Sequence, residues 1–371
     1  MNRLEEVQYK HDLIKKVLDA HQSDVMWVLK TRNIAWLTAG ADASIPLDTE
    51  FGIYSLLYTR DARYVVTQNI EYPRLRDEEE LESLGFEFKV YDWYGETPER
   101  IHGFLYSVDP QNAADGRKVM ITDAAAEADL FPLRSVLLPE EQARFRTLCQ
   151  DAAAALEWAV SAARPGESEW KIAARLDQAC RERGGVAIVN LVATDERISR
   201  FRHPLVTNAT FDHTLMMVVC MRREGLIAAA TRFSHVGAVS AELAEKVRRV
   251  SMVDAAAMIA SKPGRRLNEV FADIQAAYAA QSEPRQWQLH HQGGLIGYNS
   301  REQIATPLTD TVICAGHAFA WNPSIVGYKS EDTILVNDSG FEILTMSGGN
   351  FPTLTVEVNG QRVIRPAILE V

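Results

Sequence analysis

Residues 139–185 read PEEQARFRTLCQDAAAALEWAVSAARPGESEWKIAARLDQACRERGG, and their pattern is the strongest indication of the fold. Its first part is rich in Ala, Leu, Glu and Arg, which favour a long helix. Arg164-Pro165-Gly166 ends that helix, and Ser168 can cap a second one. Residues 241–280, AELAEKVRRVSMVDAAAMIASKPGRRLNEVFADIQAAYAA, repeat the order of long helix, Pro-Gly break and second helix. Two such copies, each followed by predicted strands, indicate an internal duplication.

The N-terminal part of the chain has a different pattern. Apolar residues at helical spacing predict a helix over 5–20, and the acidic stretch 76–84 is also expected to be helical. Short runs rich in β-branched and aromatic residues predict strands at 24–30, 51–59, 62–68, 86–95 and 118–123. Strands separated by helices indicate an α/β domain. We therefore expect an N-terminal α/β domain at 1–140 and a second domain at 141–371.

Composition limits the classes of partner. The chain has 371 residues, of which 47% are hydrophobic, so it can bury a substantial core. A net charge of -11 argues against nucleic acid or an anionic membrane as the main partner. The charged N-terminus is unlike a signal peptide, and no apolar run is long enough to span a membrane. The four cysteines are scattered, which is typical of reduced core residues rather than disulfides or a zinc site. These features predict a cytoplasmic protein.

Several motifs in the C-terminal half resemble one known family. Residues 163–169 form the helix break ARPGESE, and Thr231-Arg232-Phe233 and the turn GGLIG at 293–297 follow further along. Residues 330–336 read SEDTILV, and Trp321-Asn322-Pro323 stands where the family has Glu-Pro. With these motifs the chain resembles the creatinase, aminopeptidase P and prolidase family. The resemblance implies a creatinase-like N-terminal α/β domain, an α+β pita-bread C-terminal domain with an internal pseudo-two-fold, and a homodimer.

The same resemblance implies that a metal centre is missing. Most members hold two metal ions with two Asp, one His and two Glu; the matching positions here are Val218, Ala229, Gly294, Asn322 and Glu331. Only Glu331 keeps a strong ligand, because divalent metals bind charged oxygen or imidazole donors. We therefore expect no dinuclear metal centre and no cofactor. A single ion held by Glu331, Glu302 and His290 or His291 is the weaker alternative.

Histidine is the side chain best suited to acid–base chemistry near neutral pH. His203 lies in the kinked stretch RFRHP, where the resemblance implies a histidine that faces the substrate; a surface histidine packed by a proline is the alternative. His290 and His291 precede the Gly-Gly turn, and on an extended strand one would point inward and the other outward. Of this pair His291 is the preferred candidate. The predicted catalytic residues are His203, His291 and Glu331.

The remaining candidates would hold the substrate. A carboxylate inside the domain needs a cationic or hydrogen-bonding partner, and Arg232 is the expected partner of Glu331. Arg202 and Arg232 are candidates for binding anionic groups, although a solvated Arg202 and a structural Arg232–Glu331 pair are the plainer interpretations. Glu302, with its neighbour Arg301 a weaker candidate, His290 and Asn322 complete the substrate-binding set. Lys329 adds a positive charge, which favours a substrate with a carboxylate or a neutral polar head.

Three functions are compatible with these residues. Because creatinase has this fold and works without metals, the first is a metal-independent, creatinase-like hydrolase or lyase of a small polar C–N compound. The second is a non-catalytic, peptidase-like protein that binds a ligand or a partner, and the third is a metal-dependent Xaa-Pro aminopeptidase or dipeptidase. Convergence of His203, His291 and Glu331 on one site would favour the first over the second.

Overall fold

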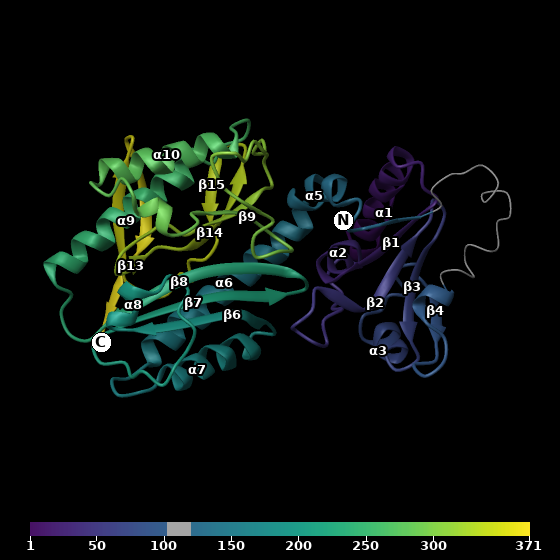
Figure 1. Ribbon diagram of the computed structural model, residues 1–371, viewed down its shortest axis with the longest axis horizontal. Helices are drawn as coiled ribbons and strands as arrows, with labels where there is room; N and C mark the ends of the chain where they lie inside the picture. The colour runs from purple at the N-terminus through teal and green to yellow at the C-terminus, as the bar shows by residue number, and fades with distance from the viewer. Residues whose placement is uncertain (102–119) are drawn as a thin grey trace. The chain divides into compact units, whose positions relative to one another are not determined.

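The computed structural model of the protein describes residues 1–101 and 120–371, and these residues divide into two compact units, Met1–Arg134 and Ser135–Val371. Residues 118 and 119, the start of one predicted strand, lie outside the described part. No helix in the described residues is both long and apolar enough to cross a membrane. Figure 1 labels the helices and strands of each unit.

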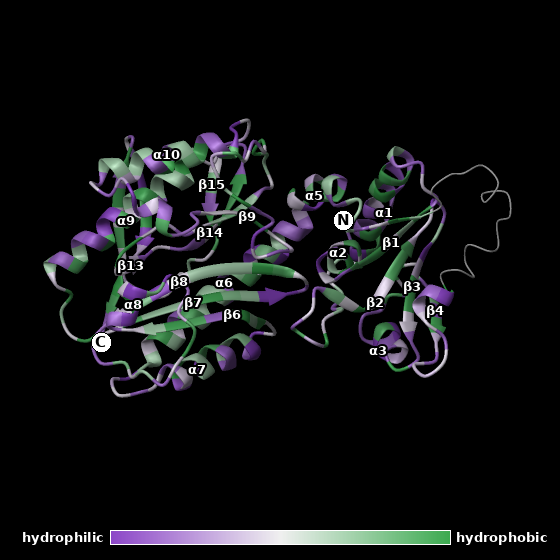
Figure 2. Ribbon diagram, viewed as in Figure 1, coloured by the Kyte–Doolittle hydropathy of each residue, from purple (hydrophilic) through white to green (hydrophobic). Residues whose placement is uncertain are grey.

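The first unit is built on a five-stranded sheet with the strand order β4-β3-β2-β1-β5. Strand β1 (Val25–Lys30) pairs antiparallel with the central strand β2 (Phe51–Tyr58) and parallel with the edge strand β5 (Met120–Thr122). On the other side of β2 lie β3 (Arg63–Gln68) and then the edge strand β4 (Glu87–Tyr91). The helices with described bounds are α1 (Arg3–Ala20), α2 (Thr31–Leu37), α3 (Tyr72–Asp77) and α5 (Glu127–Ser135). The sheet strands are mostly hydrophobic, whereas the helices carry both hydrophobic and hydrophilic residues (Figure 2).

One predicted helix of this unit is wrong. The acidic stretch 76–84 was expected to be helical, but α3 ends at Asp77 and the chain continues in turns as far as Gly85. Leu81 and Leu84 are buried, and Gly85 has φ +79°, a conformation that favours glycine. The burial of two leucines therefore favours a tight turn here, and it outweighs the helix propensity of the acidic residues.

The second unit contains two helix pairs and two larger sheets. The first pair is α6 (Pro139–Ala162) and α7 (Glu169–Glu182), which pack against the sheet β18-β8-β7-β6. The second pair is α9 (Ala241–Ala260) and α10 (Leu267–Ala280), and the second sheet has the order β10-β9-β11-β14-β15. The first-sheet strands are β6 (Val186–Thr194), β7 (Thr214–Arg223), β8 (Leu226–His235) and β18 (Ile368–Glu370).

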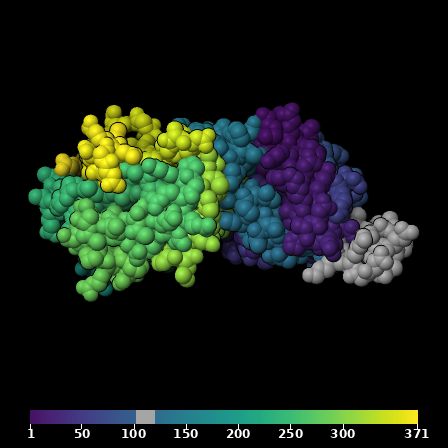
Figure 3. Space-filling view, turned by 90° about the horizontal axis from the view of Figure 1, so that it is seen from above, coloured from purple at the N-terminus to yellow at the C-terminus, as the bar shows by residue number. Residues whose placement is uncertain are grey.

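The second sheet and two small hairpins complete the unit. The second-sheet strands are β9 (Gly293–Ile296), β10 (Gln303–Ile304), β11 (Ala318–Trp321), β14 (Asp332–Asn337) and β15 (Gly340–Ile343). The hairpins are β12 (Ser324–Ile325) with β13 (Tyr328–Lys329), and β16 (Thr353–Val358) with β17 (Gln361–Pro366). In the space-filling view, α9, α10 and the C-terminal strands, coloured green to yellow, cover one face of this unit (Figure 3).

The break between the two helices of each pair is bound to the rest of the unit by an equivalent hydrogen bond, as expected for a duplication. Gly166 at the first helix break donates its N–H to Phe211 O, and Gly264 at the second donates to Ile313 O, at 2.8 and 2.9 Å. Both glycines have positive φ, +85° and +86°. Ser168 caps α7 by accepting the Lys171 N–H at 3.4 Å, as the sequence predicts. The repeated pattern in the sequence therefore corresponds to a repeated structural unit.

Candidate functional site

Three histidines from two separate segments meet in the second unit. His203 lies in the loop between α8 (Glu196–Arg200) and β7, and His290 and His291 follow the short 3-10 helix η1 (Gln286–Leu289). The Nε2 atoms of His203 and His290 are 3.1 Å apart, a hydrogen-bond distance. The ring centroid of His203 is 4.9 Å from that of His290 and 5.7 Å from that of His291. We call these three residues the histidine cluster.

The two neighbouring histidines do not point in opposite directions. Their rings are stacked, with centroids 4.4 Å apart and an interplanar angle of 25°. The expectation of one inward and one outward ring is therefore wrong, because His290 and His291 lie between η1 and β9 rather than on a regular strand. His290 is buried, His291 is partly buried and His203 is exposed. His203 is thus the member that solvent reaches most easily.

Two carboxylates hold the loop that carries His203. Asp195 has φ +52° and accepts the backbone N–H groups of Asp212, His213 and Thr214 at 2.8–2.9 Å. The fully buried Glu169 accepts from the backbone and hydroxyl of Thr207. The middle of the 201–213 loop is therefore fixed to α7, and its C-terminal end is fixed to Asp195, which follows β6. Their positioning role was missed in the sequence because both residues resemble ordinary helix-terminus carboxylates.

All three imidazoles are held in the neutral form at neutral pH. Burial lowers the pKa of His290 to about 2 and that of His291 to about 4. The nearby cations Lys329 and Arg301 add to this effect on the pKa of His291 and His203. The pKa of His203 is also lowered by burial, and the charge of Glu331 acts against that shift. A neutral imidazole can accept a proton, as general base catalysis requires.

Glu331 lies beside the histidine cluster, but its ion-pair partners are not the predicted ones. Lys329 Nζ is 2.7 Å from Glu331 Oε2, and Arg301 donates Nη2–H to Oε1 at 2.9 Å. Thr231 donates its hydroxyl to Oε2 at 2.7 Å. Although burial opposes the charge, these cations lower the pKa of Glu331 to about 2. Glu331 is therefore a fixed carboxylate at physiological pH.

The predicted Glu331–Arg232 pair is wrong. Arg232 donates to Asp332 Oδ1 at 3.0 Å and to Glu157 Oε1 at 3.2 Å. Adjacent residues of an extended chain point to opposite faces, so Asp332 faces away from the side that Glu331 occupies. Arg232 is fully buried in this second charged network and is not available to bind a substrate. Arg301 and Lys329 are the cations that pair with Glu331 in place of Arg232.

The other candidates lie at different positions around the cluster. Arg202 is half-buried and donates to Ile325 O and Gln286 Oε1 at 3.3 and 3.2 Å. It lines a cavity of about 10 Å³ together with His290 and Lys329, a volume that holds about one water molecule. Glu302 accepts the Tyr298 N–H at 3.1 Å. Asn322 is buried, and its Oδ1 has no hydrogen-bond partner among the described residues.

The sequence profile of metallopeptidase family M24 matches residues 143–338, which are more than half of the chain. The chain belongs to metallopeptidase family M24. M24 peptidases are hydrolases, so the chain is a member of a hydrolase family. No curated protein matches the sequence.

Solved structures with the same fold cover almost the whole chain. The prolidase from Pyrococcus horikoshii OT3 is 17% identical, with a TM-score of 0.73 over 92% of this chain and 99% of that one. The Xaa-Pro dipeptidase from Bacillus anthracis is 18% identical, with a TM-score of 0.74 over 93% and 99%. The N-terminal domain of the FACT complex subunit SPT16 from chickpea is 11% identical, with a TM-score of 0.69 over 93% and 97%. These likenesses confirm the prolidase-like, pita-bread fold.

Three of the positions that match the M24 metal ligands are tightly packed against neighbouring protein atoms. Val218 on β7 and Ala229 on β8 are buried, and the Ala229 N–H and C=O both bond the Thr333 hydroxyl. Gly294 has φ +155°, and a Cβ there would be 2.0 Å from Gln303 O. This backbone approach excludes any side chain at position 294, so a histidine cannot occupy it without movement of the strand.

The histidine cluster is the one group in the described residues whose donors converge as metal ligands do. One nitrogen from each histidine lies within 4.8 Å of the others. Neutral imidazole is a good ligand for zinc and similar ions. Lys329 and Arg301 oppose such binding, because their positive charges act on the same imidazoles that would hold the cation.

The lowered imidazole pKa values predict that the fold is sensitive to mild acid. In the unfolded chain His291 takes up a proton near pH 6.5, whereas in the folded chain it does so near pH 4. Stability is therefore lost as the pH falls from 6.5 toward 4, by roughly 3 kcal/mol for this one group. Urea unfolding between pH 7.5 and 4.5 should show this loss, and His291→Asn should reduce it. Equal stability at pH 7 and pH 5 would contradict the prediction, and His213→Asn, an exposed site, is the control.

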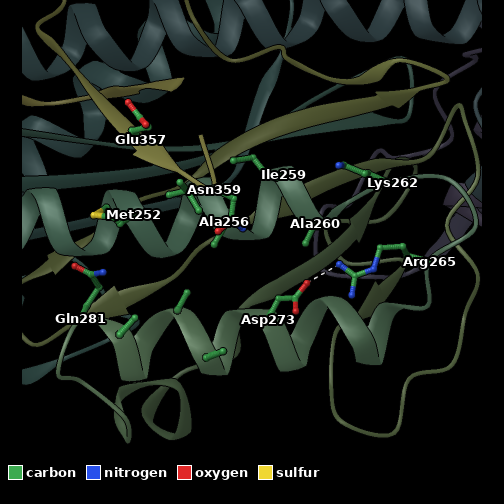
Figure 4. Close-up of a pocket in the computed structure, with 14 residues that line it drawn as sticks. Met252, Ala256, Ile259, Ala260, Lys262, Arg265, Asp273, Gln281, Glu357 and Asn359 are labelled. Atoms are coloured by element: carbon green, nitrogen blue, oxygen red, sulfur yellow. Dashed lines mark hydrogen bonds and ion pairs between the residues drawn. The ribbon is translucent and has the colours of Figure 1, made fainter. Parts of the chain in front are cut away.

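A separate groove of about 530 Å³ lies on the outside of the second unit, between α9, α10 and the turn of the β16–β17 hairpin. Figure 4 shows Arg265 and Asp273 joined by an ion pair at one end, with Met252 and Glu357 further along. None of its lining residues belongs to the histidine cluster or contacts Glu331. The groove is therefore separate from the candidate site.

Proposed function

We propose that this protein is a metal-independent, creatinase-like hydrolase or lyase that acts on a small polar C–N compound. The observation that carries the proposal is the meeting of three neutral imidazoles beside one fixed carboxylate, Glu331, in an M24 domain. Imidazoles can take and return a proton, and the charged groups around them can orient a polar substrate. This combination supports acid–base chemistry at a site where four of the five matching ligand positions hold Val, Ala, Gly and Asn.

His203 is the proposed general base. It is the exposed member of the cluster, whereas burial lowers the pKa of His290 to about 2 and makes that imidazole a very weak base. The hydrogen bond between the two Nε2 atoms fixes the His203 ring. His291 is the proposed second acid–base group, and Glu331, which stays ionised, stabilises positive charge that develops during the reaction.

A non-catalytic binding or partner protein is the second candidate function. The fold does not by itself specify peptidase activity, since it is shared with the N-terminal domain of a FACT complex subunit. The uncompensated polar atoms of the site, such as Asn322 Oδ1, would suit a bound ligand equally well. Turnover separates the two candidates, because a binding protein holds the compound without changing it.

We expect the purified protein to contain less than about one tenth of an equivalent of transition metal and to leave Xaa-Pro dipeptides intact when manganese or cobalt is added. The physical reason is that only Glu331 offers a strong ligand among the five matching positions. Elemental analysis and a dipeptide cleavage assay measure both quantities. Stoichiometric metal together with metal-dependent cleavage would contradict the proposal and support the third candidate, a metal-dependent Xaa-Pro peptidase.

The substrate is found by a screen of guanidino, ureido and amide metabolites, with release of a small amine or of urea as the readout. A hit that depends on His203 supports the enzyme, whereas a compound that binds and is recovered unchanged supports the binding protein. We further propose that the protein forms a homodimer in the cytoplasm. The resemblance to the creatinase and prolidase family supports the dimer, and sedimentation equilibrium tests it.

A further inference from the structure

Four consecutive residues, 329–332, connect the candidate site to a buried charged network. Lys329 and Glu331 act on all three imidazoles of the histidine cluster, and Lys329 lines the small cavity together with His290. Ser330 and Asp332 bond into the network instead. Because the contacts of these side chains alternate along the segment, whatever fixes Ser330 and Asp332 also sets the position of the other two.

Arg365 on β17 binds this segment to α9. Its Nη2 group donates to Asp254 Oδ2 at 2.6 Å, to Ser330 Oγ at 3.2 Å and to Asp332. The Ser330 hydroxyl donates to the same Asp254 oxygen at 2.6 Å. Arg365 and both aspartates are fully buried and Ser330 is almost fully buried, so solvent screens these contacts very little. One nitrogen of Arg365 therefore holds α9 and both network residues of the segment together.

The hairpin that supplies Arg365 lies beyond residues 143–338, the part of the chain that matches the family profile. Of the side chains that this fully described hairpin buries, Val356, Val363, Arg365 and Pro366, Arg365 alone is charged. A buried cation is unfavourable unless it meets an anion, so the carboxylates of the network explain its position. The hairpin thus places one cation directly behind the segment that carries Lys329 and Glu331.

We infer that Arg365 is a positioning residue for the candidate site, because the segment it holds carries the two charged groups, Lys329 and Glu331, that act on the histidine cluster. Arg365 acts through this segment and not on a substrate. The inference rests on the proposed function, since it takes the histidine cluster as the working site, and it adds the C-terminal hairpin as the element that sets the position of the charges there.

The first test observes the site without turnover, so its failure can be told apart from failure of the proposed reaction. The full-length protein is labelled with 15N-histidine, and its imidazole resonances are recorded at pH 7.5, where the cluster is neutral. Arg365→Met should move the resonances of His203 and His291 by more than a line width, because their charged neighbours shift. Arg365→Lys should leave them near the parent positions, since Nε and Nη1 of Arg365 have no partner among the described residues and one ammonium group can replace Nη2.

Hydrogen exchange tests the same point along the backbone. The Ser330 N–H donates to Pro323 O and the Thr231 N–H donates to Glu331 O, both at 3.0 Å, so these two amides report the position of the segment. Arg365→Met should accelerate exchange at both amides at least about tenfold more than elsewhere in the second unit. Ser330→Ala removes the hydroxyl link but keeps the ion pairs. It should give a smaller change of the same sign, which covers the case in which Arg365→Met fails to fold.

Val363→Ala is the matched control, because Val363 is buried two residues earlier on the same strand and contributes packing without charge. It should loosen the hairpin but leave the imidazole resonances and the exchange of the Ser330 amide as in the parent. Equal effects in Val363→Ala and Arg365→Met would overturn the inference, because they would show a merely structural role. Parent resonances and parent exchange in Arg365→Met, or equal disturbance in Arg365→Lys, would also overturn it.

Kinetics give the last test. On the substrate that the metabolite screen identifies, Arg365→Met should lower kcat by about 10² with a smaller change in KM, a loss typical of displaced catalytic groups. An unchanged kcat in a variant with displaced resonances would overturn the positioning role. Displaced resonances without any turnover in the screen would leave that role standing and count against the enzyme.

Discussion

His203→Asn is expected to lower kcat by a factor of 10² to 10⁴ on the substrate that the metabolite screen identifies, the range typical of losing a general base. The effect should fall on kcat more than on KM, because the imidazole acts on a proton in the transition state. In the parent, activity should fall with a midpoint below pH 6.5, since burial lowers the pKa of His203 and the neutral imidazole is the active form. That acidic limb should disappear in the variant.

The control for this experiment is His213→Asn, the same substitution at an exposed histidine at the end of the same loop. It should retain the parent kcat and the parent pH profile. A His203→Asn protein that keeps the parent kcat would show that the general base lies elsewhere. If only KM rose, the histidine would instead bind substrate, and the catalytic assignment would pass to His291.

Arg365→Met is expected to destabilise the protein by about 3 to 5 kcal/mol, the typical loss when one partner of a buried ion network is removed. Arg365 on β17 contacts Asp254 Oδ2 at 2.6 Å and also Asp332, and all three side chains are fully buried. Methionine fills similar space but leaves two carboxylates without that cation. Denaturant unfolding at pH 7.5 measures the loss.

The pH dependence of this loss gives an independent check. Burial raises the pKa of Asp254 to about 6 even with Arg365 present, and removal of the cation should raise it further. A proton on Asp254 then replaces the missing charge, so the deficit of Arg365→Met should shrink between pH 7.5 and 5.5. Arg248→Met, which breaks an exposed pair with Glu245, should cost less than about 1 kcal/mol. Similar losses in both variants would contradict the buried-network argument.

The fold was largely predictable because its signals are local. Helix propensity, a Pro-Gly break and a capping serine lie within 139–185 and recur within 241–280, and α6, α7, α9 and α10 follow them. Runs rich in β-branched and aromatic residues likewise predicted β1, β2 and β3. The helix prediction for the acidic stretch 76–84 was wrong because two buried leucines impose a turn. Their burial depends on tertiary packing, which local helix propensity does not describe.

The residue types of the site can be read from the amino-acid sequence: three histidines, one carboxylate at a ligand position, and packing residues where metal ligands would stand. How these residues combine depends on tertiary contacts. His203 meets His290 across 87 residues, and Thr231 meets Glu331 across 100, so no local pattern records either contact. The partner of Glu331 changed from Arg232 to Lys329 and Arg301 because alternate residues of an extended chain face opposite sides, and which side faces the histidines is fixed by sheet packing.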